Sequence, residues 1–201
     1  AVQGDVADPA QVEAIFAAAD AFGTLTGLVN NAGIVGPAER VDAMTPERLT
    51  RMFAVNVLGS FYCAREAIRR LSTRHGGQGG AIVNLSSAGA KLGSPGQYVD
   101  YASAKGAIDT FTVGLALELA GEGIRVNSVR PGIIDTDIHA SGGQPDRAQR
   151  LSHLIPMKRP GTAQEIAAAI VWLLSDEAGY TTAITGKWHL GDEAEYQPNK
   201  R

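Results

Sequence analysis

The residues with the clearest chemical potential are a tyrosine and a lysine four positions apart, Tyr101 and Lys105. In a helix this spacing places both side chains on one face, so that an ammonium group lies within a few ångströms of a phenol. The cation favours the phenolate and is expected to lower the pKa of the tyrosine. The pair is therefore a candidate general acid or base for a substrate oxygen.

A serine at the end of a short apolar run supplies a second reactive group. Ser87 closes the segment 81–87, fourteen positions before Tyr101. A hydroxyl group at the carboxyl end of a parallel strand lies where ligands bind in open α/β sheets. We therefore expect Ser87 to polarise a substrate carbonyl.

These groups need strands and helices to position them. The segment 98–119, which carries the Tyr–Lys pair, is predicted to be helical by its length and composition. The apolar run 81–87 is too short for a helix and is typical of a buried strand. A further strand is predicted at 124–129, where Pro131 and Gly132 stop it.

The rest of the chain continues this alternation. Asp8, Thr45 and Thr162 are predicted N-caps, each followed by a helical pattern. Alternating strands and helices predict a parallel sheet covered on both faces. The remaining expected elements are the end of a strand at residues 1–3, a strand at 25–30 and helices at 9–22, 45–71 and 162–174.

Composition excludes several classes of protein. The 201 residues are 44% hydrophobic and 19% charged, which is typical of a soluble globular domain and not of a membrane protein. Basic residues are scattered and the net charge is −3, so we expect no nucleic-acid partner. The four histidines lack the spacing of a metal site, and we expect them in loops or facing solvent. The single cysteine, Cys63, predicts an inert thiol and, without a leader segment, a cytoplasmic location.

Five short motifs follow one another along the chain on suitable elements: Asn30-Asn31-Ala32-Gly33, Phe53-Ala54-Val55-Asn56-Val57, Ser86-Ser87, Tyr101-Ala102-Ser103-Ala104-Lys105 and Arg130-Pro131-Gly132. Together they resemble the short-chain dehydrogenase/reductase family over residues 1–177. The resemblance implies a Rossmann-like, doubly wound α/β domain that uses NAD or NADP. It also implies hydride transfer between the nicotinamide and the carbon of an alcohol or ketone.

The resemblance also implies a role for each motif residue. Tyr101 is the acid or base, Lys105 lowers its pKa and holds the nicotinamide ribose, and Ser87 orients the carbonyl. Ser86 is the alternative serine, because the spacing from Ser87 to Tyr101 is one residue longer than is commonest in the family. Asn56 holds a water that links Lys105 to solvent. The residues matched to cofactor contacts are Asp5, Val6, Asn30, Ala32, Gly33, Tyr101, Lys105, Pro131, Gly132, Ile134 and Thr136.

The helix predicted at 98–119 is apolar on more than one face, for example at Phe111, Val113 and Leu117. A helix with one solvent-exposed face is not expected to have this pattern. One face can cover the sheet and the other a second subunit. We therefore expect a homodimer or homotetramer. Tyr98, which has Ala102 and not a cation four positions later, is expected to be a wall of the pocket.

The chain departs from the family pattern at its start. The Thr-Gly-x-x-x-Gly-x-Gly turn that binds the pyrophosphate in the family is not found in the sequence. We therefore expect a sheet that lacks its first two strands, with segment 25–30 as an exposed apolar edge. The hypothesis that follows is poor dinucleotide binding, because the helix N-terminus that would stabilise the pyrophosphate is missing.

The chain departs again at its end. Residues 178–201 contain Gly186-Lys187-Trp188-His189-Leu190-Gly191 and resemble a sulfatase segment, in which Lys187 and His189 would contact a sulfate. The expected organisation is a partial dehydrogenase domain at 1–177 and a foreign tail at 178–201. The alternative is that Ile184-Thr185-Gly186, followed by Asp192, imitates the last reductase strand. Two other functions stay open: a fragment without cofactor or catalysis and, more remotely, sulfate-ester hydrolysis.

Overall fold

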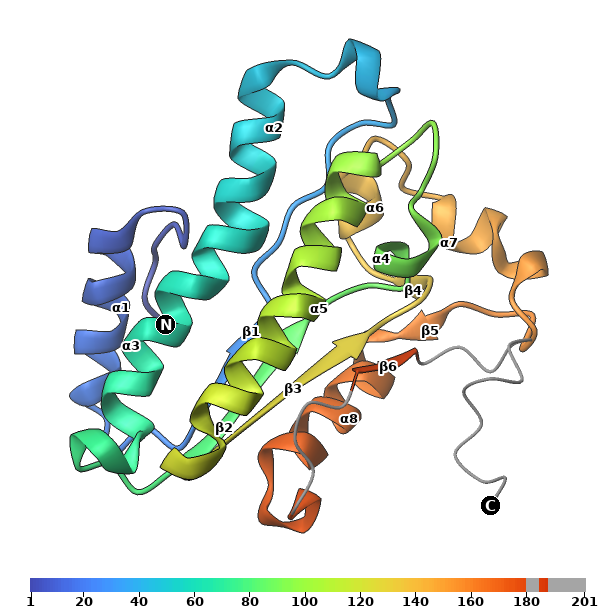
Figure 1. Cartoon of the computed structure of the whole chain (residues 1–201). Coiled ribbons are helices and arrows are strands. Elements are labelled where there is room, and N and C mark those ends of the chain that lie inside the picture. Colours follow the sequence, from blue (N-terminus) through green and yellow to red (C-terminus); the bar gives the residue numbers. More distant parts are fainter. Residues whose placement is uncertain (180–184, 188–201) are drawn as a thin grey trace.

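A parallel sheet forms the centre of the molecule in this computed structural model, which describes residues 1–179 and 185–187 (Figure 1). Within that part of the chain the sheet has four strands in the order β1-β2-β3-β6, and every pair is parallel. A small second sheet pairs β4 with β5. The strands are β1 Gly27–Asn30, β2 Gly80–Leu85, β3 Ile124–Arg130, β4 Ile134–Asp135, β5 Gly161–Thr162 and β6 Thr185–Lys187.

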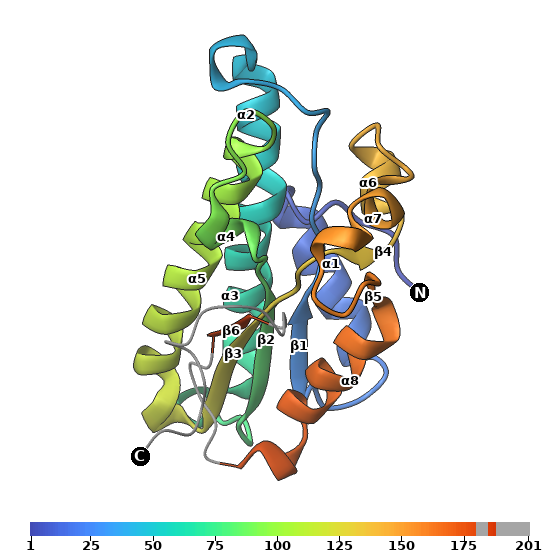
Figure 2. The same ribbon diagram turned by 90° about the vertical axis from the view of Figure 1, so that its right-hand side faces the viewer.

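Helices cover both faces of the sheet (Figure 2). Helices α3 (Gly59–Leu71) and α5 (Val99–Leu119) lie on one face, and α8 (Ala163–Leu174) lies on the other. Alternate residues of β2 explain this, because Ile82 packs with α3 and α5 whereas Val83 packs with α8. The predicted doubly wound α/β fold is confirmed.

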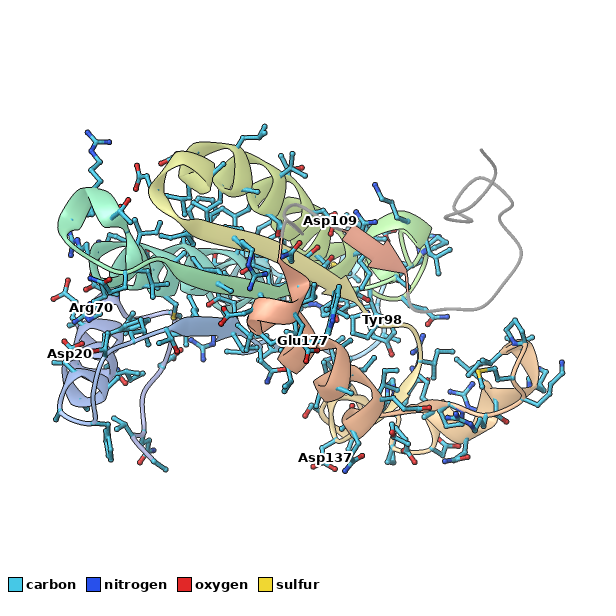
Figure 3. All side chains as sticks on the ribbon, turned by 90° about the horizontal axis from the view of Figure 1, so that it is seen from below. Asp20, Arg70, Tyr98, Asp109, Asp137 and Glu177 are labelled. Atoms are coloured by element: carbon cyan, nitrogen blue, oxygen red, sulfur yellow. The ribbon has the colours of Figure 1, made fainter. Side chains whose placement is uncertain are left out.

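Helix α1 (Pro9–Asp20) packs against α3 and completes the first layer. Val12 and Phe16 of α1 are buried in the same core as Ala67 and Leu71 of α3. An ion pair between Asp20 and Arg70 joins the two helices, with N–O distances of 2.7 and 2.8 Å (Figure 3).

Shorter helices and turns connect these elements. They are α2 (Pro46–Phe53), α4 (Gly89–Leu92), α6 (Ile138–Ser141), α7 (Arg147–Arg150), a π-helical turn η2 (Ala54–Leu58) and the 3₁₀ turns η1 (Val41–Ala43), η3 (Thr73–His75), η4 (Ala120–Glu122), η5 (Ser152–Leu154) and η6 (Asp176–Ala178).

The predicted N-caps are confirmed. Asp8 and Thr45 accept hydrogen bonds from backbone N–H groups in the first turns of α1 and α2. Thr162 and Glu165 form a reciprocal capping box at the start of α8. Local sequence therefore determines where these three helices begin.

Two predicted elements differ in the structure. The long helix expected at 45–71 is interrupted by the π-helical turn η2, where the side chain of Asn56 bonds to the backbone of Ile34. Residues 1–3 form no strand, because they do not pair with any strand of the described sheets. Both differences depend on contacts distant in sequence.

Strand β1 lies at the edge of the described sheet, as predicted for this apolar segment. In the described residues it pairs with β2 alone, and Val29 is 37% exposed. At the other edge, β6 pairs with β3 in parallel, with Thr185 opposite Ser128. The segment expected to be foreign therefore contributes a strand to the sheet, as the alternative interpretation predicted. His189 and the segment 192–194 lie outside the described residues.

Nothing in the described part of the chain forms a helix with the length and hydropathy needed to cross a bilayer. Cys63 is buried in α3, and burial raises the pKa of its thiol, which fits the expected inert side chain. The cytoplasmic location stays a prediction.

Candidate active site

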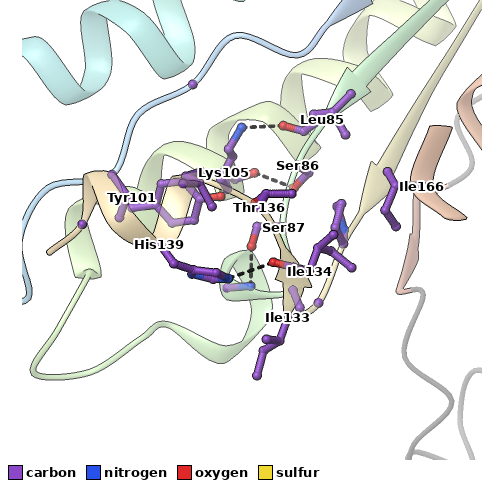
Figure 4. A pocket seen from close by; sticks show the side chains of 18 of the residues that line it. Leu85, Ser86, Ser87, Tyr101, Lys105, Ile133, Ile134, Thr136, His139 and Ile166 are labelled. Atoms are coloured by element: carbon purple, nitrogen blue, oxygen red, sulfur yellow. Dashed lines mark hydrogen bonds between the residues drawn. The ribbon is translucent and has the colours of Figure 1, made fainter. Parts of the chain in front are cut away.

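A cavity of about 800 Å³ opens at the carboxyl ends of the strands (Figure 4). Ser87 from the segment after β2 and Tyr101 and Lys105 from α5 line it. Ile133, Ile134 and Thr136, from the segment after β3, line it as well. The parallel sheet thus brings together residues that are nearly fifty positions apart, at the edge where ligands bind in this architecture.

Tyr101 is partly buried at the wall of this cavity, beside a serine and a cation. Burial raises the pKa of the Tyr101 phenol, while the nearby Ser87 hydroxyl and the positive charge of Arg147 act in the opposite direction. The Nζ atom of Lys105 lies 5.7 Å from the centroid of the tyrosine ring. The expectation of a lowered tyrosine pKa was wrong for this state of the protein, because the cost of burying the phenolate exceeds the stabilisation by its neighbours.

Lys105 is 4% exposed and has unused hydrogen-bonding capacity. Its Nζ atom donates to the carbonyl oxygen of Leu85 at 2.6 Å. Burial lowers the pKa of Lys105 to about 8, although the nearby Asp109 opposes this shift. An ammonium group has three N–H donors, and within the described residues only Leu85 accepts from it. Two donors are therefore available to a ligand in the cavity.

The two serines after β2 have different surroundings. The hydroxyl of Ser86 donates to the backbone carbonyl of Lys105 at 3.1 Å and is buried against α5. The hydroxyl of Ser87 accepts from the N–H of Gly89 at 3.0 Å, lines the cavity with Tyr101 and acts to lower the pKa of that tyrosine. This arrangement favours Ser87 over Ser86 as the serine that contacts a substrate.

Asn56 acts on the loop after β1. Its Oδ1 atom accepts from the N–H of Ile34 at 2.9 Å, and its Nδ2 donates to the Ile34 carbonyl at 3.0 Å. A Cβ atom on the adjacent Gly33 would lie 2.7 Å from Asn56 Oδ1 and 3.5 Å from Lys105 Nζ. Glycine is therefore required where this loop passes between the two side chains. The water relay assigned to Asn56 stays a prediction.

The other expected cofactor residues divide into two groups. Gly33, Pro131, Gly132, Ile134 and Thr136 line the cavity. Asp5, Val6, Asn30 and Ala32 do not: Asp5 pairs with Arg51 at 2.7 Å, while Val6, Asn30 and Ala32 line a separate hollow of about 280 Å³ beside β1.

A buried polar network supports the elements that carry the site. The sequence motifs do not reveal it. Asn30 Nδ2 donates to Asn84 Oδ1 at 2.8 Å, and Asn84 Nδ2 donates to the hydroxyl of Thr112 at 2.9 Å. Asn84 and Thr112 are completely buried, so the network links β1, β2 and α5 through satisfied hydrogen bonds. The sequence signal for it is an asparagine inside each of two apolar strands.

An ion-pair cluster fixes the start of α5. Arg48 contacts both carboxylate oxygens of Asp100, at 2.8 and 3.4 Å. It also donates to the carbonyl of Pro37 at 2.8 Å and to Glu39 at 3.0 Å. Asp100 accepts from the N–H of Tyr101 in turn, at 2.9 Å. The cluster therefore ties the loop before α2 to the turn that carries the candidate acid or base.

The segment after β4 contributes two groups that were not expected. His139, predicted to face solvent or lie in a loop, is half-buried and lines the cavity, where burial lowers its pKa. Its Nε2 lies 2.9 Å from the carbonyl oxygen of Ile134. Arg147 lines the same cavity and lies 5.4 Å above the ring of Tyr98. Tyr98 is a cavity wall, as expected, but its cation comes from this distant segment and not from its own helix.

Comparison with known proteins places these features in a family. A family model described as enoyl-(acyl carrier protein) reductase matches residues 1–189. An Escherichia coli protein named uncharacterized oxidoreductase YgfF is 56% identical over 182 residues, which are 90% of this chain and 74% of that protein. The 3beta-hydroxysteroid dehydrogenase 1 of Eggerthella lenta is 40% identical, over 92% of this chain and 70% of that protein.

The solved structures show the same fold. The crystal structure of 3-ketoacyl-(acyl-carrier-protein) reductase from Brucella melitensis complexed with NADH matches with a TM-score of 0.85 and 30% identity. The match covers 94% of this chain and 76% of that one.

The family match continues beyond residue 177 and includes β6, so the expected sulfatase-like segment finds no support. The match starts at residue 1 and gives no support to a lost glycine-rich unit either. The division of the chain at residue 177 stays a prediction. The chain belongs to the short-chain dehydrogenase/reductase family, whose members are NAD(P)-dependent oxidoreductases.

Proposed function

We propose that this chain transfers a hydride between NAD or NADP and the carbon of an alcohol or ketone, with Tyr101 as the acid or base. The observation that carries the proposal is one cavity lined by Ser87, Tyr101 and the buried ammonium of Lys105, in which Ser87 is close enough to the phenol of Tyr101 to lower its pKa. Relatives named as dehydrogenases and reductases support the reaction class.

The residues around the cavity fit a nicotinamide nucleotide. Lys105 has two N–H donors for the hydroxyl groups of a ribose. Gly132 allows close approach of a flat ring to the backbone, and Ile134 and Thr136 follow it at the cavity wall. When bound, the nicotinamide supplies or accepts the hydride.

The chain's own residues move the proton. Tyr101 holds it on its phenolic oxygen and gives it to the carbonyl oxygen in the direction of reduction, or accepts it in the direction of oxidation. Ser87 donates a hydrogen bond to the same oxygen and so stabilises the charge that develops there. Lys105, which is mainly protonated below pH 8, stabilises the phenolate. Asn56 would hold the water through which Lys105 exchanges protons with solvent.

A fluorescence titration with NADH and NADPH tests the proposal. We expect saturable binding of at least one nucleotide, followed by its oxidation when a ketone is added. Absence of saturable binding at millimolar nucleotide would favour the second candidate, a fragment without a cofactor site. Exposure of the edge strand β1 is the observation that keeps this candidate in view.

The same family fold carries a surface suited to a second subunit. Leu117 of α5 is 76% exposed, and Phe61 of α3 packs on Phe111 with ring centroids 4.0 Å apart while staying 46% exposed. Apolar side chains exposed side by side on two helices favour association. Light scattering is expected to give the mass of a dimer or tetramer, and a monomeric mass would overturn this part of the proposal.

A further inference from the structure

We propose that Arg147 selects the substrate, and that the substrate is a carbonyl compound or alcohol that also carries a carboxylate. This inference rests on the proposed function, because it names the substrate class of the same cavity. The reaction would leave the carboxylate unchanged: the hydride joins the carbonyl carbon, and the proton from Tyr101 joins the oxygen.

Arg147 differs from the other arginines in its hydrogen bonding. Among the described residues, its guanidinium has no carboxylate within 4.0 Å and donates no hydrogen bond, while its backbone N–H donates to Gln144. Every other described arginine pairs with a carboxylate or a backbone carbonyl. These are Arg40, Arg48, Arg51, Arg65, Arg69, Arg70, Arg74, Arg125, Arg130, Arg150 and Arg159.

The position of Arg147 is fixed although its guanidinium N–H groups are not used. Its guanidinium lies over the ring of Tyr98, 5.4 Å from the centroid. The hydroxyl of Tyr98 accepts from Gln144 at 2.8 Å, and Gln144 in turn accepts from Arg150. A cation–π contact orients the guanidinium and leaves its five donors for a ligand. The guanidinium of Arg147 is therefore held in position to bind a ligand.

The cation also lies close to the candidate acid or base. Arg147 lines the same cavity as Ser87 and Tyr101. Burial raises the pKa of Tyr101, and the charge of Arg147 is near enough to oppose that shift. A molecule whose carbonyl oxygen contacts Ser87 and Tyr101 can therefore extend toward Arg147.

The remaining cavity wall offers little competition for this charge. Asp137 is the single carboxylate among the lining residues, and it is exposed and forms no ion pair with Arg147 within 4.0 Å. Many of the other lining side chains are apolar, including Val35, Leu92 and Ile138. A carboxylate can accept two parallel N–H bonds from a guanidinium, and these charge-assisted bonds are stronger than those to a neutral ester.

The experiment compares oxo acids with their neutral esters. The probes are 4-oxopentanoate and 5-oxohexanoate, each beside its methyl ester. Binding to the full chain is measured by calorimetry without cofactor, and turnover is measured with NADH and NADPH. The variants are Arg147→Gln, Arg147→Lys and, as a control that removes one surface charge, Arg40→Gln, whose side chain is 77% exposed and outside the cavity.

We expect the wild type to bind and turn over at least one acid better than its ester. Arg147→Gln should lower the affinity for that acid by about 10- to 100-fold and leave the affinity for the ester unchanged. Arg147→Lys restores part of the preference, and Arg40→Gln changes nothing. Circular dichroism checks that each variant is folded. The inference would be overturned if the wild type preferred neither acid over its ester, or if Arg147→Gln lowered the affinity for acid and ester equally.

Two further results are informative. One distinguishes a substrate carboxylate from the diphosphate of the cofactor as the anion that Arg147 binds, and the other distinguishes failure of the proposed function from failure of this inference. If Arg147→Gln weakens the binding of NADH and NADPH and not that of the acid, the arginine recognises the diphosphate of the cofactor and the inference is wrong. If the acids bind through Arg147 but neither the acids nor their esters oxidise NADH or NADPH, the proposed function fails, and of the inference only the recognition of a carboxylate by Arg147 stands.

Discussion

Two regions meet at the cavity, and they are held together in different ways. The frame, formed by β2, β3 and α5, carries Ser87, Tyr101 and Lys105 and is stabilised by strand pairing and completely buried amides. The wall, residues 136–158, consists of short helices and turns held by side-chain hydrogen bonds such as Gln144 to Tyr98. The reacting groups therefore lie on rigid elements, and the proposed recognition group lies on a segment that can vary.

The largest expected effect is on the frame. Tyr101→Phe removes the proton donor and is expected to lower kcat/KM by about 10²- to 10⁴-fold. The free energy of unfolding is expected to change by ~1 kcal/mol or less, because the substitution removes at most one hydrogen bond of a hydroxyl group. Steady-state kinetics and urea unfolding measure the two quantities. Tyr62→Phe on α3, outside the cavity, is the matched control. Full activity in Tyr101→Phe would remove this tyrosine from the mechanism.

The next effect concerns how the frame is anchored. Arg48→Met leaves the buried carboxylate of Asp100 without its cation and is expected to cost about 3 kcal/mol of stability. Arg40→Met breaks an exposed pair with Asp42 and should have no measurable effect. Thermal and urea unfolding compare the two. Equal midpoints for both variants would show that the Arg48 cluster does not anchor α5.

Lys105→Met tests the buried cation by its pH dependence. Burial lowers the pKa of Lys105 to about 8 from 10.5, so the unfolded chain holds this proton to higher pH than the folded chain does. The buried ammonium therefore destabilises the folded protein by its full amount below pH 8, and this destabilisation decreases as the pH rises from about 8 to 10.5. Lys105→Met is therefore expected to lose activity. Its stability advantage over the wild type is expected to be larger at pH 7 than at pH 10.5, by on the order of 3 kcal/mol.

Urea unfolding of wild type and Lys105→Met at several pH values checks this sign. The difference between the two proteins should shrink from pH 8 upward. A difference that is constant with pH would mean that the lysine carries its full charge at no cost in the folded state.

The smallest effect is expected in the wall. Gln144→Leu removes the hydrogen bonds that link Tyr98 to Arg150, and stability should change by about 1 kcal/mol or less. Because this change loosens the position of Arg147, KM for an oxo acid should rise by a few fold while kcat stays near that of the wild type. A fall in kcat comparable to that of Tyr101→Phe would mean that frame and wall are not separable.

Much of the frame and of the elements around it could be predicted from local patterns. The caps at Asp8, Thr45 and Thr162 and the strands ending near Asn30 and Ser87 depend on residues close in sequence. The Tyr–Lys spacing placed both groups on one helix, and the structure brings them to the same cavity as Ser87.

The wall could not be predicted in the same way. Arg147 and His139 have no local motif, and the segment that carries them has no long apolar repeat. Their contacts with Tyr98 and Ile134 depend on how the chain turns after β4. The raised pKa of Tyr101 was missed for a related reason, since burial is a property of the whole fold.

The sequence by itself determined the alternation of strands and helices, three helix starts and the pair of residues able to exchange a proton, because each depends on neighbours within a few positions. Tertiary structure decided the π-helical turn at Asn56, the burial that sets the pKa of Tyr101 and Lys105, and the place of Thr185–Lys187 in the sheet. It also decided that Arg147 has no ionic partner among the described residues and lines the cavity. The physical reason is that desolvation and ion pairing are set by groups far apart along the chain, whose distances no local pattern contains.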